Sequence, residues 1–264
     1  MRSVPLNGIE IAYRQAGSGS PIVFAHGAAS DGRHWRPQLE GLAGDLTVVA
    51  WDEPGAGRSS DLPAADFGLA GIADTLAGLI EALDLAPAHV GGLSWGGVVA
   101  QELYRRRPDV VGTLILADTY AGWKGSLPAA EVEARVAAFH RDLAAPEFKA
   151  NLPGLFAPDP SPAVVAEVER IMADVRPESM RHTIEAIAAC DLRDSLPEIA
   201  VPALLVWGEH DARSPPASVA RQFHDAIPDS ELVLIPGAGH ISNLERPELF
   251  NAAVRDFCRA HPLS

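Results

Sequence analysis

The sequence predicts an α/β fold in which helices cover both faces of a mainly parallel sheet. Short, continuous apolar runs recur along the chain, for example residues 22–25 and 47–51, and they alternate with segments of helical period such as 71–83. A strand that is apolar at every position is typical of a parallel sheet buried on both faces, whereas apolar residues three or four apart indicate a helix. The regular alternation of the two patterns therefore favours one α/β domain.

The core elements follow from these patterns in chain order. Asn7-Gly8 lies between two alternating runs, which predicts a hairpin of two opening strands. The next predicted elements are a strand over 22–25, a helix over 35–42, a strand over 47–51, a helix over 71–83, a strand ending at 89–92, a helix over 96–107 and a strand over 113–117. The last part of the chain adds strands over 203–207 and 231–235 and a closing helix over 247–259.

Between residues 121 and 195 the alternation lapses, and the pattern is helical with prolines as interruptions. The simplest account is a helical cap over residues 121–195, inserted after the sixth strand into a core of residues 1–120 and 196–264. Such an insertion would lie over the carboxyl ends of the strands, where open α/β sheets bind their ligands.

Length and charge limit the classes of function. With 264 residues the chain suits one sizeable domain, and its formal net charge of −14 argues against nucleic acid as a partner. No run approaches the roughly 18 apolar residues of a membrane span, and residues 1–8 lack the apolar stretch of a signal peptide. We therefore expect a cytoplasmic protein, monomeric or homodimeric, without a membrane partner.

The two cysteines, Cys190 and Cys258, lie far apart in the sequence. One disulfide between them is possible, but two buried free thiols are the favoured interpretation for a cytoplasmic protein. Neither cysteine has the spacing of a zinc site, so the sequence predicts no metal and no cofactor.

Gly92-Leu93-Ser94-Trp95-Gly96 matches the pattern G-x-S-x-G between a predicted strand and a predicted helix. A serine on that turn takes up a strained backbone conformation, and the flanking glycines leave room for strand and helix to approach each other. The turn presents the hydroxyl outside the sheet and directs the helix N-terminus at it, which favours developing negative charge. A glycine-rich turn with an incidental serine is the alternative, and the flanking elements favour Ser94 as a nucleophile.

A serine hydroxyl needs a base near neutral pH, and His240 is the predicted base among nine histidines. It follows the last predicted strand and a glycine-containing turn, so it emerges at the same edge of the sheet as Ser94. Asp211, which follows the preceding strand, is the predicted acid that orients the imidazole. Asp118 is its rival, since it also follows a strand that ends at this edge.

An oxyanion that forms at a substrate carbonyl needs hydrogen-bond donors. The turn places the backbone N–H of Trp95 for this role, and the N–H of Ala28, in the loop after the strand over 22–25, is the expected second donor. His26 in the same loop is interpreted as structural rather than as a second base. The glycine-rich loop 52–59 has neither phosphate-binding pattern, G-x-x-x-x-G-K-[ST] or G-x-G-x-x-G opening a helix, and is also interpreted as structural.

These segments together resemble the α/β-hydrolase superfamily over essentially the full length of the chain. The matching segments are His26-Gly27, Asp52-x-Pro-Gly-x-Gly-Arg-Ser59, Gly92-Leu-Ser-Trp-Gly-Gly97, Trp207-Gly-Glu-His-Asp211 and Gly237-Ala-Gly-His240. The resemblance implies the α/β-hydrolase fold, with a mainly parallel eight-stranded sheet and a triad of Ser94, Asp211 and His240 in the superfamily's chain order. Leu116-Ala-Asp-Thr-Tyr-Ala-Gly-Trp123 and the cap length are most similar to the group of 3-oxoadipate enol-lactonases, cofactor-free haloperoxidases and small carboxylesterases.

The resemblance implies a serine hydrolase that cleaves a small-molecule carboxylic ester or lactone through an acyl-enzyme on Ser94. Epoxide hydrolases and haloalkane dehalogenases share the fold but use aspartate at the elbow, so Ser94 excludes their chemistry here. Two alternatives stay open. One is C–C bond, thioester or perhydrolase chemistry on the same triad, and the other is a triad-bearing ligand receptor that signals by closing its cap.

The cap is expected to select the substrate. Apolar cap residues are candidates for the pocket wall, although each also suits packing against the core: Trp123, Phe139, Phe148, Leu152, Leu155, Phe156, Met172, Met180, Ile184 and Ile187. The four that we take as pocket residues are Trp123, Phe139, Phe156 and Ile184. The candidates for binding a substrate carboxylate are Arg33, Arg58 and Lys124.

Overall fold

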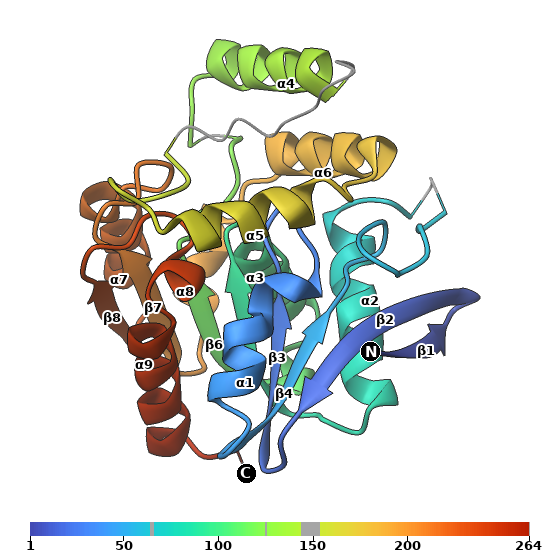
Figure 1. Ribbon diagram of the computed structural model, residues 1–264, viewed down its shortest axis with the longest axis vertical. Helices are drawn as coiled ribbons and strands as arrows, with labels where there is room; N and C mark the ends of the chain where they lie inside the picture. The colour runs from blue at the N-terminus through green and yellow to red at the C-terminus, as the bar shows by residue number, and fades with distance from the viewer. Residues whose placement is uncertain (64–65, 125, 144–153, 264) are drawn as a thin grey trace.

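The computed structural model describes residues 1–63, 66–124, 126–143 and 154–263, and it contains one eight-stranded sheet (Figure 1). The strands are β1 (Arg2–Leu6), β2 (Ile9–Ala16), β3 (Ser20–Ala25), β4 (Leu46–Trp51), β5 (Ala88–Leu93), β6 (Val111–Ala117), β7 (Ala203–Gly208) and β8 (Ser230–Ile235). Their order across the sheet is β1-β2-β4-β3-β5-β6-β7-β8. β2 pairs antiparallel with β1 and β4, and every other neighbouring pair is parallel. The predicted α/β fold with a mainly parallel eight-stranded sheet is confirmed.

Both faces of the centre of the sheet are covered, which explains why β3, β4, β5, β6 and β7 are apolar along most of their length. Alternate residues of β3 point to opposite sides: Val23 and Ala25 belong to one apolar cluster, and Ile22 and Phe24 belong to the other. The helices that contribute to the first cluster include α2 (Leu69–Ala82), α3 (Trp95–Arg106) and α7 (Arg221–Ala226). Those that contribute to the second include η1 (Gly32–Trp35), α1 (Arg36–Gly41) and α9 (Pro247–Ala260).

The described helices between β6 and β7 lie above the carboxyl edge of the sheet in Figure 1. Its helices are α4 (Ala129–Leu143), α5 (Pro162–Met172), α6 (Pro177–Ala189) and the 3₁₀ helix η3 (Arg193–Glu198). Arg176, just before α6, donates to the carbonyl oxygens of Gly55 at 2.8 Å and Ser59 at 2.7 Å. Arg33 pairs with Asp174, between α5 and α6, at 2.8 Å. These bonds fix the α5–α6 end of the segment to the loop after β4 and to η1.

The sequence patterns do not predict two short helical segments near the end of the chain. Between β7 and β8 the structure has η4 (Pro216–Ala220) followed by α7, and after His240 it has α8 (Ser242–Glu245). Helices of four to six residues contain too few turns for a helical period to be recognised.

Both cysteines are free thiols. Cys258 is buried as predicted, but Cys190 is partly exposed, because it caps the C-terminus of α6 beside a surface groove. The prediction that both thiols are buried is therefore wrong for Cys190. In the part of the chain that the structure describes, no helix is long and apolar enough to cross a membrane, and no group of three or more His, Cys, Asp or Glu side chains is arranged to hold a metal ion.

Candidate active site

Ser94 lies at a sharp turn between β5 and α3. Its backbone has a φ of 54° and a ψ of −117°, a conformation that residues with a side chain rarely adopt. Glycine is required on both sides of the serine: a Cβ on Gly92 would lie 2.1 Å from the carbonyl oxygen of Gly96, and a Cβ on Gly96 would lie 2.1 Å from that of Ala25. The strained turn that the G-x-S-x-G pattern predicts is thus formed, and it holds the serine at the carboxyl edge of the sheet.

His240 and Asp211 form one hydrogen-bonded chain with Ser94. Nε2 of His240 lies 2.9 Å from Oγ of Ser94, and Nδ1 lies 2.9 Å from Oδ2 of Asp211. An ionised carboxylate only accepts hydrogen bonds, so Nδ1 carries the imidazole proton and Nε2 is able to accept the proton of the serine hydroxyl. All three residues are buried. The structure therefore brings together the three residues that the sequence proposes as a triad.

The second oxygen of Asp211 is held by the backbone. Its Oδ1 accepts hydrogen bonds from the N–H groups of Arg213 at 2.8 Å and Ser214 at 3.0 Å. Hydrogen bonds of this kind stabilise the ionised carboxylate. They also fix its orientation toward the imidazole of His240.

Asp118, the rival carboxylate, makes different contacts. Its Oδ1 accepts from the N–H of Gly208 at 2.7 Å, and its Oδ2 accepts from the N–H and the hydroxyl of Ser242 at 3.2 and 2.5 Å. Burial raises the pKa of Asp118 well above its usual range, and the charge of Asp211 acts in the same direction. Asp118 thus links the end of β7 to the start of α8. The geometry therefore favours Asp211 as the partner of His240.

Ala28 and Trp95, the two proposed oxyanion donors, both lie close to the serine in the fold. Trp95 is the first residue of α3, so its N–H has no carbonyl one turn earlier in the helix to bind. Ala28 follows Gly27, on which a Cβ would lie 3.6 Å from Cβ of Ser94. The two donors proposed from the sequence therefore lie on the turn itself and on the loop that passes next to it.

The segment before α5 is bound to the loop that carries His240. The backbone N–H of His240 donates to the carbonyl oxygen of Leu155 at 3.0 Å. The carboxylate of Glu245 accepts from the N–H of Ala157 at 2.9 Å and from the N–H of Gly239 at 2.7 Å. The position of His240 thus depends on hydrogen bonds that join the helical insertion to the core.

A small cavity of about 30 Å³ lies between the loop after β3 and helix α6. Ala28, Glu53 and Met180 are among the residues that line it. Met180, a member of the apolar cap set, therefore lines the same cavity as Ala28, a proposed oxyanion donor.

The other apolar cap residues are placed differently. Phe148 and Leu152 lie outside the described residues. The side chains that pack on the two apolar clusters of the core include the four taken as pocket residues, Trp123, Phe139, Phe156 and Ile184. None of these four lines the cavity beside Ala28. Their contact with a substrate stays a prediction.

The three basic residues considered for a substrate carboxylate have different surroundings. Arg33 already pairs with Asp31 at 2.6 Å and with Asp174 at 2.8 Å. Arg58 and Lys124 are both exposed. Binding of a substrate carboxylate by any of them stays a prediction.

Two residues near Ser94 are missing from the sequence-based site. The hydroxyl of Tyr120 contacts Ser94, and burial raises the pKa of this phenol. The carboxyl of Glu53 accepts a hydrogen bond of 2.8 Å from Nε1 of Trp95, and burial raises its pKa to about 8. Tyr120 follows β6 and Glu53 follows β4. A search of every polar residue after a strand at this edge would have found both.

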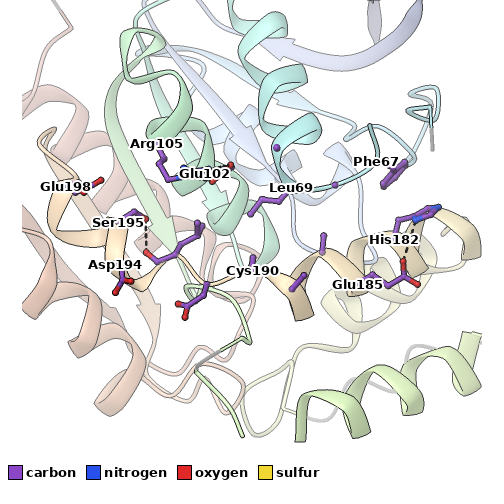
Figure 2. Close-up of a pocket in the computed structure, with 16 residues that line it drawn as sticks. Phe67, Leu69, Glu102, Arg105, His182, Glu185, Cys190, Asp194, Ser195 and Glu198 are labelled. Carbon is purple, nitrogen blue, oxygen red and sulfur yellow. Dashed lines mark hydrogen bonds and ion pairs between the residues drawn. The ribbon is translucent and has the colours of Figure 1, made fainter. Parts of the chain in front are cut away.

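A separate groove of about 590 Å³ lies between two pairs of helices (Figure 2). The start of α2 and the C-terminal part of α3 line one side, and α6 and η3 line the other. Its buried carboxylate, Glu102, is paired with Arg105 at 2.7 Å. Ser94, Asp211 and His240 are not among the residues that line it. The groove therefore lies outside the candidate active site.

The model of the alpha/beta hydrolase fold family matches residues 20–247, and the chain belongs to this family of hydrolase enzymes. Among solved structures it is similar to a thermophilic esterase from Thermogutta terrifontis with malate bound, at 30% identity and a TM-score of 0.89 over 99% of this chain and 100% of that one. It is also similar to the enol-lactonase from Burkholderia xenovorans LB400, at 30% identity and a TM-score of 0.86 over 98% and 100% of the two chains. A protein named as the carbamate hydrolase RutD in Azorhizobium caulinodans is 29% identical over 260 residues, which are 94% of this chain and 95% of that protein. The resemblance to the enol-lactonase and esterase group is thereby confirmed.

Proposed function

We propose that this protein is a serine hydrolase that cleaves a carboxylic ester or a lactone through an acyl-enzyme on Ser94. The observation that carries the proposal is the hydrogen-bonded chain of Ser94, His240 and Asp211, in which both distances are 2.9 Å. The similar proteins named as an esterase and an enol-lactonase support the same class of reaction.

In this mechanism Ser94 attacks the carbonyl carbon of the substrate while Nε2 of His240 takes the hydroxyl proton. Asp211 stabilises the imidazolium, and the N–H groups of Ala28 and Trp95 bind the oxyanion. His240 then protonates the leaving alcohol. A water molecule, activated by the same imidazole, attacks the acyl-enzyme and releases the acid.

The direct test combines Ser94→Ala with a fluorophosphonate probe that reacts covalently with activated serines. We expect the wild type to hydrolyse p-nitrophenyl acetate and to carry one phosphonyl group on Ser94 by peptide mass spectrometry. Ser94→Ala should lose about 10³-fold or more in turnover at an unchanged melting temperature. Ser218→Ala, at an exposed serine, is the matched control. Unchanged turnover in Ser94→Ala would overturn the proposal.

Other reactions on the same three residues are separated by a substrate screen. The screen compares p-nitrophenyl esters, lactones, acyl thioesters and β-diketones, and it includes peracid formation from hydrogen peroxide. The proposal expects the highest kcat/KM on an ester or a lactone. A receptor would bind its ligand with little or no turnover, so rapid multiple turnover removes that alternative.

We further propose that residues 121–195 act as a cap that selects the substrate. The position of α4, α5 and α6 above the carboxyl edge of the sheet supports this role (Figure 1). The hydrogen bond between His240 and Leu155 supports it as well, because it connects the insertion to the proposed base. A small-molecule substrate, a monomeric or homodimeric state and a cytoplasmic location stay predictions.

A further inference from the structure

Glu53 is a buried carboxylic acid that the proposed mechanism does not use. It lies in the loop after β4, and its residue is only 4% exposed. Its Oε2 accepts a hydrogen bond of 2.8 Å from Nε1 of Trp95, a residue with no exposed surface. The backbone N–H of that same tryptophan is one of the two proposed oxyanion donors. The carboxyl of Glu53 therefore anchors the residue that carries this donor.

His26 connects the same glutamate to the other proposed donor. The backbone N–H of Glu53 lies 3.0 Å from Nε2 of His26, and Nδ1 of His26 lies 2.9 Å from the carbonyl oxygen of Gly27. A backbone N–H only donates, so Nε2 accepts it and Nδ1 carries the proton that is donated to Gly27. Burial lowers the pKa of His26, which favours this neutral form.

The hydrogen bond to Gly27 also orients Ala28. The carbonyl of Gly27 and the N–H of Ala28 belong to one planar peptide group, in which they point in opposite directions. A bond that holds the carbonyl therefore fixes the direction of the N–H. This peptide lies beside the nucleophile, because a Cβ on Gly27 would be 3.6 Å from Cβ of Ser94.

We propose, resting on the hydrolase function above, that Glu53 is a positioning residue of the oxyanion hole: with His26 it connects the Ala28 peptide to Trp95 and fixes the separation of the two N–H donors. Oxyanion stabilisation depends on donors that are in place before the charge forms. Breaking the connection lowers kcat more than it raises KM, because the two N–H groups bind the transition state more strongly than the substrate.

The ionisation of Glu53 is expected to make turnover depend on pH. Burial raises the pKa of Glu53 to about 8, and the hydrogen bond from Trp95 opposes this shift. The charge of Glu53 acts on the hydroxyl of Tyr120, which contacts Ser94. Ionised Glu53 thus places a negative charge near the forming oxyanion, and like charges repel. Turnover is expected to fall as the pH rises through about 8.

Other ionisable groups surround Glu53 on several elements. They lie on β2, on the loops after β3, β4 and β6 and on the segment between α5 and α6. These groups are Arg14, His26, Asp31, Asp52, Tyr120, Asp174 and Arg176. Arg14 pairs with Asp52 at 2.6 Å, and Arg176 pairs with Asp61 at 3.1 Å. Burial raises the pKa of Tyr120 and lowers that of His26, so neither gains a charge near pH 8. The expected loss of turnover near pH 8 is therefore assigned to Glu53.

The test measures kcat and KM for p-nitrophenyl acetate between pH 6 and 9.5 in the wild type, Glu53→Gln and Glu53→Leu. Glutamine keeps an oxygen acceptor for Trp95 but cannot ionise, so Glu53→Gln should lose the alkaline decrease in kcat. Leucine removes the acceptor, so Glu53→Leu should lower kcat at pH 7 by about 10-fold or more, with KM changed less than about threefold. Glu53→Gln should keep most of the kcat that Glu53→Leu loses at pH 7.

Glu102→Gln is the matched control. Glu102 is a buried carboxylate on α3, the helix that Trp95 begins, and it pairs with Arg105 at 2.7 Å outside the proposed connection. This variant should keep the alkaline decrease of the wild type. The melting temperatures of all three variants are measured as well. They show whether a lower activity comes from less folded protein or from a lower turnover of each folded molecule.

Three results would overturn the proposed role of Glu53. These are an alkaline decrease that persists in Glu53→Gln, a wild-type kcat in Glu53→Leu, and a wild type without Ser94-dependent turnover. The third result overturns the hydrolase proposal as well, whereas the first two leave it standing. If Glu53→Leu does not fold, the pH profile of Glu53→Gln alone tests the proposed role of Glu53.

Discussion

Asp118 and Asp211 follow the adjacent parallel strands β6 and β7, and the charge of Asp211 acts on Asp118, yet Asp211 is the one whose carboxylate contacts His240. Asp118 accepts hydrogen bonds from Gly208 and Ser242 instead. Because burial and the charge of Asp211 raise the pKa of Asp118 well above its usual range, the neutral form of Asp118 is favoured. Of the two carboxyl groups, Asp118 is thus the one favoured as a neutral acid, and Asp211 is the one that faces the imidazole.

The two carboxylates are therefore expected to respond differently to the same substitution. Asp211→Asn should lower kcat by about 10³- to 10⁴-fold, because an amide neither stabilises the imidazolium nor keeps the proton on Nδ1. Asp118→Asn should lower kcat by less than about 10-fold, since a neutral amide resembles a protonated carboxyl and a lost hydrogen bond costs about 1 kcal/mol of stability. Hydrolysis of one ester at pH 7.5 measures both variants. Equal losses would contradict the assignment of Asp211.

The strained turn at the serine predicts a large effect of one added methyl group. In Gly92→Ala the new Cβ would lie 2.1 Å from the carbonyl oxygen of Gly96, so the strand and the helix have to move apart. We expect a loss of about 2 kcal/mol or more in the free energy of unfolding, measured by urea denaturation. Gly44→Ala is the control, because its Cβ would have no atom within 4 Å. A similar loss in both variants would contradict the steric argument.

The signals that predict the sheet and the hairpin are local, and this is why they succeed. Asn7 and Gly8 both adopt positive φ, 49° and 86°, as a two-residue hairpin turn requires. The continuous apolar runs reflect burial of the central strands on both faces, and each predicted run falls within a strand of the structure. Helix α8 is missed because its four residues carry no helical period.

Some residues of the site can be predicted from the topology of the sheet, whereas the roles of others depend on how their side chains pack. Parallel strands end at a common edge, so residue type and position after a strand were enough to propose Ser94, His240 and Asp211. The roles of Glu53 and Tyr120 depend on side-chain direction and on burial, which residue type does not reveal. The same holds for the apolar cap residues, because a helical period predicts a buried face without saying whether the core or a substrate covers it.

Glu245 offers a test of how the insertion supports the proposed base. Its carboxylate accepts from the N–H groups of Ala157 and Gly239, and Glu245→Ala leaves both donors without this partner. We expect a loss of about 1 to 3 kcal/mol in the free energy of unfolding. A lower kcat is also expected, because Gly239 precedes His240. Glu248→Ala, at an exposed position on α9, should change stability by less than about 0.5 kcal/mol. A wild-type kcat in Glu245→Ala would show that His240 is positioned without this bridge.

The pH dependence of stability gives an independent measure of the buried carboxyl of Glu53. Its pKa is about 8 in the folded protein and about 4.3 in an unfolded chain. Because the folded pKa is the higher one, the contribution of this group to stability is fully present below about pH 4 and is lost as the pH rises toward 8. Glutamine does not titrate, so Glu53→Gln should gain about 3 to 4 kcal/mol relative to the wild type between pH 5.5 and 8.5. Urea denaturation of both proteins at the two pH values measures this difference. A constant difference would mean that Glu53 is already ionised at pH 5.5 in the folded protein.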